Sequence, residues 1–124
     1  MRRRGRFARR LRADDGGVTV EAAIGVAAIV VAVALCLGAV LAASAQVRCV
    51  DAAREAARLA ARGDSARART AAERVAPPEA EIAIRQEGEL IVAEVSARTP
   101  LLPVRLRAEA VAVREPGVAG GQGR

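Results

Sequence analysis

The feature that most constrains this chain is a stretch of 26 residues without a charged side chain, from Ala22 to Val47. A helix of about 20 apolar residues is long enough to cross the hydrocarbon core of a bilayer. The stretch therefore predicts a single membrane-spanning helix, with the span at about residues 22–45 and the lipid bilayer around it. A conventional soluble globule is also disfavoured, because Phe7 is the only aromatic residue and large aromatic residues supply much of an ordinary core.

Arginine is distributed unevenly on the two sides of this stretch. Seven of the 20 basic residues, which are all arginine, lie within the first twelve positions. The positive-inside rule then predicts a single-pass protein of the cell membrane, with a cytoplasmic N-terminus and an extracellular C-terminal part. A basic segment can also bind nucleic acid, but one phenylalanine does not make an aromatic platform for stacking on bases, so no nucleic-acid partner is expected.

The helix is predicted to continue beyond the membrane, over Val18 to Arg62. Residues 48–62 contain strong helix formers and neither glycine nor proline. Charged residues at three- and four-residue intervals form one stripe: Arg48, Asp51, Glu55, Arg58 and Arg62. Small apolar residues form a second stripe: Val50, Ala53, Ala57 and Ala60. Within the span, Ala34, Gly38 and Ala42 follow one another at intervals of four, a spacing that lets helices approach closely in lipid. An alanine-rich sequence also produces such spacings by chance.

Glu21 stands at the N-terminal edge of the apolar stretch. A charge in lipid is costly and is usually paired or functional, although an acid near a helix N-terminus is also favoured by the helix dipole. The surrounding sequence, DDGGVTVEAA, resembles the type III signal of prepilins. That resemblance implies cleavage between Gly16 and Gly17 by a prepilin peptidase, which removes a basic cytoplasmic leader, residues 1–16. It also implies that Glu21, the fifth mature residue, pairs with the free N-terminal amine of a neighbouring subunit.

The resemblance extends to the TadE-family minor pilins of actinobacteria, which belong to the tight-adherence (Tad) type IV pilus system. It covers roughly residues 14–117 and rests on VTVEAA, QVRCVDAAREAARLAARGD and the ending AVAVREPG. Major pilins of that system usually carry a tyrosine after the glutamate, where this chain has Ala22, so a minor pilin or pseudopilin is favoured. The family implies assembly through the N-terminal helix, with other pilin subunits and the Tad assembly machinery as partners, and no enzymatic activity.

Two other interpretations of the N-terminal half remain open. Ala43, Ser44 and Ala45 form an A-x-A pattern, so type I signal peptidase could cleave after Ala45 and release a small secreted domain. The apolar run exceeds the 7–15 residues typical of a signal peptide, which opposes that interpretation. An uncleaved single-span membrane anchor is the other alternative.

The C-terminal half predicts a small strand-rich head. Residues 63–76 form a helical or linker segment, and Pro77-Pro78 ends any helix there. The segments EIAIRQE, ELIVAEVSAR and VRLRAEAVAV alternate with a period of two, which predicts a three-stranded antiparallel sheet with one face on the helix and the other facing water. The expected fold is therefore α+β and pilin-like, with a long helix over residues 17–62, a head over 77–115 and a flexible tail over 116–124.

The remaining reactive residues give little sign of chemistry. The chain has no histidine, so acid–base catalysis and Cys–His metal sites have little support, and no cofactor is expected. Cys36 and Cys49 lie 13 residues apart on one predicted helix, too far for a disulfide within the chain. Cys49 could bridge to a partner across a helix bundle, or both thiols stay free. Arg105 and Arg107 share a strand face with Glu109, which we interpret as a solvated charged surface.

Overall fold

The computed structural model describes the backbone of residues 7–99 and 103–117, and the side chains of residues 16–99 and 103–117. The elements in chain order are α1 (Phe7–Ala61), α2 (Ser65–Val75), β1 (Glu81–Glu87), β2 (Leu90–Arg98) and β3 (Arg105–Val113). The predicted α+β fold, a long N-terminal helix followed by a three-stranded antiparallel sheet, is confirmed. The start of the predicted leader and most of the predicted tail, residues 1–6 and 118–124, lie outside the described residues.

Helix α1 begins eleven residues earlier than the predicted start at Val18. The preceding segment contains Phe, Leu, Ala and several Arg residues, most of them good helix formers. Each of Gly16 and Gly17 costs a helix interior about 1 kcal/mol relative to alanine, which is not enough to end a helix that is favoured on both sides. The helix ends at Ala61, and Gly63 adopts a φ of +86° in the turn to α2.

The chain divides into two compact units, Met1–Leu37 and Gly38–Arg124. The described part of the first unit is helix alone, and its large apolar side chains are exposed. Val18 is 68% exposed, and Ile24 and Ile29 are each 65% exposed. The helix is long and apolar enough to cross a membrane near the N-terminus, which supports a single-pass membrane protein.

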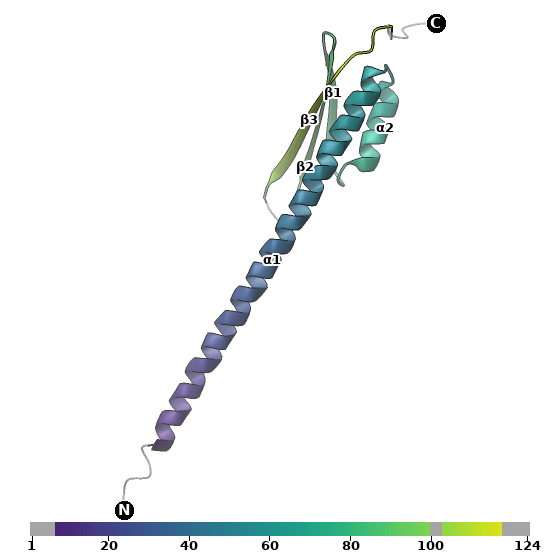
Figure 1. Cartoon of the computed structure of the whole chain (residues 1–124). Helices are drawn as coiled ribbons and strands as arrows, with labels where there is room; N and C mark the ends of the chain where they lie inside the picture. The colour runs from purple at the N-terminus through teal and green to yellow at the C-terminus, as the bar shows by residue number, and fades with distance from the viewer. Residues whose placement is uncertain (1–6, 100–102, 118–124) are drawn as a thin grey trace, which may run out of the picture. The chain divides into compact units, whose positions relative to one another are not determined.

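The second unit contains the predicted head, residues 77–115, together with the C-terminal part of α1 and helix α2, which pack with the sheet (Figure 1). From here on, the head means this whole unit. The sheet has the order β1-β2-β3, and both pairs are antiparallel. The two-residue connection from β1 to β2 places Gly88 first, with a φ of +63°, as a type II′ turn requires. The inner face of β2 is buried completely or nearly so.

The core of the head is built mainly from small side chains. Helix α1 contributes one cysteine and a row of alanines, and the largest fully buried side chains are Val95 and Cys49. The α1 residues of the main core cluster are Cys49, Ala52, Ala53, Ala56 and Ala57. Because these side chains are short, the helix backbone can lie close to the sheet, so the head closes without any aromatic residue.

Side-chain hydrogen bonds hold helix α2 at both of its ends. The Asp64 carboxylate accepts a hydrogen bond from the Arg67 backbone N–H at 3.0 Å, which caps the first turn. At the other end, the Arg48 guanidinium donates to the backbone oxygens of Val75 (3.1 Å) and Ala76 (2.9 Å). Arg48, predicted as part of a charged surface stripe, therefore joins α1 to the end of α2.

The outer face of the sheet was predicted to be exposed to water, but along the central strand β2 its side chains are largely covered. Val92 is only 6% exposed, and the Glu94 side chain is 16% exposed. Arg107 lies 2.7 Å from the Glu94 carboxylate and Arg85 lies 3.7 Å from it. Side chains from both outer strands thus lean over β2, while those at the sheet edges remain exposed.

We expect Val95→Ala to destabilise the head by about 2 kcal/mol, since it removes two buried methyl groups and leaves a cavity. Cys49 is fully buried, so labelling of its thiol requires the head to open. Burial also raises the pKa of this thiol, with Arg48 partly opposing the rise. In a Cys36→Ala background, Val95→Ala should accelerate maleimide labelling of Cys49 by about 30-fold when opening and closing are fast.

The matched control is Val111→Ala, which makes the same change at a side chain that is 55% exposed on β3. It should leave the labelling rate within about twofold, because exposed substitutions are usually worth less than about 0.5 kcal/mol. Equal rates for both variants would contradict a head packed around Val95.

Candidate functional site

Gly16 and Gly17, the residues on either side of the predicted cleavage, lie within α1 and are exposed. A Cβ atom built on either glycine meets no described atom within 4 Å, so close packing in this structure does not require a glycine at either position. Both residues lie in right-handed helix and neither has a positive φ. The backbone of the described residues therefore gives no reason for two glycines here.

Glu21 lies one helical turn beyond Gly17, on the same side of α1. It is exposed, and its carboxylate forms no ion pair within the part of the chain that the structure describes. Its neighbours along the helix are apolar and exposed, with Val20 at 59% and Ile24 at 65%. Among the residues whose side chains are described, an unpaired carboxylate thus stands at the edge of an uncovered apolar surface, which is available to lipid or to another helix.

The small residues proposed for helix packing have different environments. Ala34 is exposed and belongs to the first unit. Gly38 is buried and Ala42 is half-buried, and both belong to the head. Their role in helix packing stays a prediction.

The two cysteines are both free. Cys36 is exposed on α1, whereas Cys49 is fully buried in the core of the head. A bridge from Cys49 to another chain would require the folded head to open. Within the head this thiol serves as a small core side chain.

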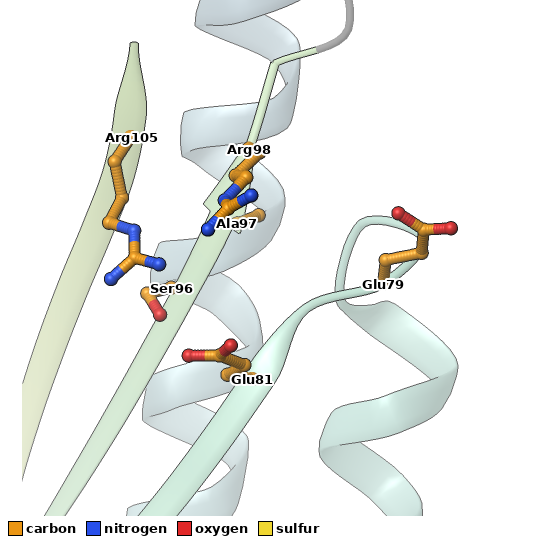
Figure 2. A pocket seen from close by; sticks show the side chains of 6 residues that line it. All are labelled: Glu79, Glu81, Ser96, Ala97, Arg98 and Arg105. Carbon is orange, nitrogen blue, oxygen red and sulfur yellow. The ribbon is translucent and has the colours of Figure 1, made fainter. Parts of the chain in front are cut away.

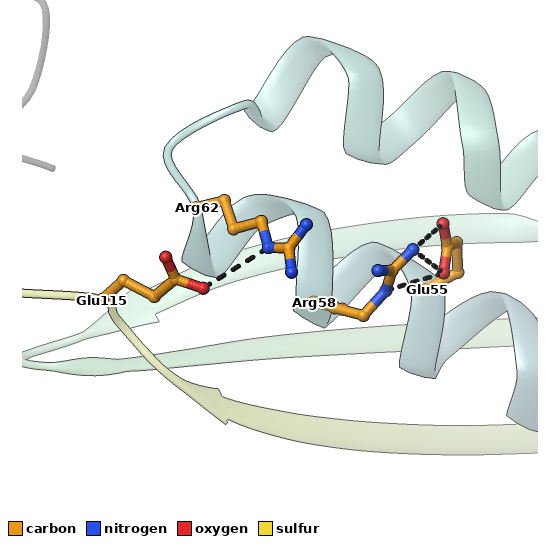
Figure 3. Close-up of polar contacts among 4 residues, drawn as sticks. All are labelled: Glu55, Arg58, Arg62 and Glu115. Carbon is orange, nitrogen blue, oxygen red and sulfur yellow. Dashed lines mark hydrogen bonds and ion pairs between the residues drawn. The ribbon is translucent and has the colours of Figure 1, made fainter.

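The charged stripe at the end of α1 is largely paired within the chain (Figure 3). Arg58 lies 2.8 Å from the Glu55 carboxylate, and this hydrogen bond holds the pKa of Glu55 below its usual value. Arg62 lies 3.4 Å from Glu115, whose backbone N–H also donates to the Ala61 carbonyl at 3.1 Å. These contacts tie the segment after β3 to the end of α1, a role that the sequence did not reveal because the partners are over 50 positions apart.

A pocket of about 260 Å³ lies at the end of the sheet where β2 finishes and β3 begins (Figure 2). Its charged lining comes from Arg98 and Arg105 on one side and from Glu79 and Glu81 on the other. Ser96 and Ala97 complete it. Arg98 was not singled out from the sequence, because its position beside Arg105 follows from the strand register.

Comparison with known proteins places the chain among its relatives. No protein-family model matches it, and no solved structure matches it. A protein of Mycobacterium tuberculosis strain H37Rv named "Apoptosis inhibitor Rv3655c" is 50% identical over 99 residues, which cover 79% of each of the two chains. With that identity over most of both lengths, the chain belongs to the family of Rv3655c.

Proposed function

We propose that this protein is a minor pilin or pseudopilin of the Tad type. In this proposal a prepilin peptidase cuts between Gly16 and Gly17. The processed subunit then joins a filament through contacts made by the apolar surface of its helix. The resemblance to TadE-family pilins is one support. The observation that carries the proposal is Glu21, an exposed carboxylate without an ion-pair partner among the described residues, beside an uncovered apolar helix surface.

The physical logic of docking follows from the cost of isolated charges in apolar surroundings. Cleavage creates a new amine at Gly17, and a bundle of apolar helices gives that amine and the Glu21 carboxylate little solvation. Pairing the amine of one subunit with the carboxylate of the next offsets part of both costs. A subunit that has not docked keeps Glu21 unpaired.

The glycines at the cut also fit processing. A peptidase needs access to the backbone, and Gly16 and Gly17 make local unwinding of α1 easier by about 1 kcal/mol each relative to alanine. Since close packing does not explain either glycine, recognition by the peptidase is a better explanation for them.

The stability of the head does not distinguish the secreted-domain alternative from the pilin proposal. The sequence of the mature N-terminus does. The residues of α1 in the main core cluster begin at Cys49, after the A-x-A pattern that ends at Ala45. Cleavage there would therefore keep the buried residues of that core and remove Ala45, which is half-buried against them. The relative's name refers to inhibition of apoptosis, but it specifies no partner or mechanism, and we propose no such activity for this chain.

We expect the mature protein to begin at Gly17, as measured by N-terminal sequencing of membranes, sheared filaments and culture medium. Gly16→Glu should retain the leader, because it places a charged side chain where the prepilin signal has glycine. A mature start at Gln46 in the medium would replace the pilin proposal with a secreted domain. An intact Met1 beside an active prepilin peptidase would leave a simple anchor.

The matched control for that experiment is Ala43→Leu, which removes the small residue of the A-x-A pattern at an exposed position. It keeps the segment apolar and leaves Gly16 and Gly17 untouched. Processing at Gly17 should be unchanged in this variant.

We expect Glu21→Ala to insert into the membrane normally and to enter filaments at least about 100-fold less, since an unpaired buried charge costs about 3–5 kcal/mol. Glu21→Gln, which keeps the size of the side chain, should be similarly impaired because the charge is lost. Quantitative immunoblots of membranes and sheared filaments measure both fractions.

Asp51→Ala is the control for loss of an acidic residue from the same helix. Asp51 is exposed and lies outside the charge-free stretch. This variant should assemble as the parent does. Undiminished assembly of the Glu21 variants would remove the proposed role of that carboxylate.

A further inference from the structure

Two arginines at one end of the sheet face each other, and neither has an acidic partner among the residues that the structure describes. Arg98 ends β2 and Arg105 begins β3, and the antiparallel register places them directly opposite each other. Both are exposed, and neither has a carboxylate within 4.0 Å in the described ranges. Like charges directly opposite each other destabilise a sheet, so an anion held between the two guanidinium groups would relieve that repulsion.

The position of this pair along α1 follows from two contacts within the head. The Gln46 side chain donates to the Arg107 carbonyl at 3.0 Å, and the Glu115 N–H donates to the Ala61 carbonyl at 3.1 Å. β3 therefore runs along α1 in the same direction. Arg105 precedes Arg107 by two residues, about 6.6 Å of strand, which equals about four residues of helix rise.

The arginine pair is thus level with about residue 42 of α1, near the end of the charge-free stretch that stops at Val47. Val104, the residue before Arg105, is itself 48% exposed. Residues 38–47 of that stretch belong to the head itself. When these residues occupy the outer edge of a bilayer, the end of the head that carries the arginine pair meets the boundary between hydrocarbon and headgroups. Arginine side chains at that boundary reach their charged groups toward the headgroup phosphates.

The pocket beside the pair has the chemistry of a phosphate site. In Figure 2 the side chains of Arg98 and Arg105 extend into the same space, with Ser96 below them and Glu81 on the β1 side. Guanidinium groups bind phosphate through paired hydrogen bonds, which an ammonium group cannot match in geometry. The carboxylates of Glu79 and Glu81 on the other side suit a headgroup that also carries an amine.

We propose that Arg98 and Arg105 bind the phosphate of a membrane phospholipid, and that this contact sets how the head sits on the bilayer surface. The proposal rests on insertion of the apolar stretch into a membrane and not on filament assembly. Loss of lipid binding and loss of assembly are therefore separate outcomes.

The test uses the full chain in dodecyl maltoside, with native mass spectrometry to measure binding of defined lipids. Dioleoyl phosphatidylethanolamine and dioleoyl phosphatidylglycerol are the phospholipid probes, and dioleoylglycerol is the probe that lacks phosphate. Arg98→Gln/Arg105→Gln should weaken phospholipid binding by about tenfold or more and leave dioleoylglycerol binding unchanged. Stronger binding of phosphatidylethanolamine than of phosphatidylglycerol would add support for the amine contact with Glu79 and Glu81.

The matched control is Arg54→Gln/Arg67→Gln, which removes the same charge from exposed positions on α1 and α2 away from the pocket. It should retain parental binding. Equal losses of phospholipid binding in the two double variants would mean that binding depends only on net charge, and the proposed site would be wrong. Displacement of the lipid by millimolar inorganic phosphate would mean that the site binds free phosphate, and the proposal of a lipid ligand would be wrong.

Folding of the variants is checked through the labelling rate of Cys49 in a Cys36→Ala background. Removing a repulsive cross-strand pair should leave this rate unchanged or lower it. A faster rate together with lost binding would mean that the arginines hold the head together, and the proposal would be wrong.

Discussion

The packing of the alanine face of α1 on the inner face of the sheet is the contact on which the rest of the head depends. Ala52, Ala53 and Ala56 are completely buried, and Val95 fills the middle of the central strand against them. One helix therefore has two functions. Its first part presents exposed apolar side chains, and its last part supplies the core of a small domain that would be marginal alone.

This division of one helix explains the unusual composition. A core of small side chains needs close approach between backbones, and the alanine row of α1 permits it. Large aliphatic residues are concentrated instead on the N-terminal part of the helix, where they are exposed. Most of the large apolar side chains of this helix are thus exposed. Such a surface is covered by lipid or by neighbouring helices.

The charged residues also separate into two kinds. Most arginines of the head are engaged locally: Arg48 holds the end of α2, Arg58 pairs with Glu55, and Arg107 pairs with Glu94. Such contacts hold the elements of the head in register. Glu21 and the Arg98–Arg105 pair have no ion-pair partner among the described residues, and both proposals begin from those groups. One group would act in contacts between subunits, the other in contacts with lipid.

Local sequence alone predicted the membrane-length helix, from its charge-free run, and the three strands, from their period of two, because each depends on residues that are close in sequence. The position of Glu21 at the edge of the apolar stretch was equally a local fact. Only the tertiary structure decided that Cys49 is buried, that Arg48 reaches the end of α2, and that Arg98 stands opposite Arg105. Those features depend on which helix face meets the sheet and on strand register, and both are set by packing between residues distant in the chain.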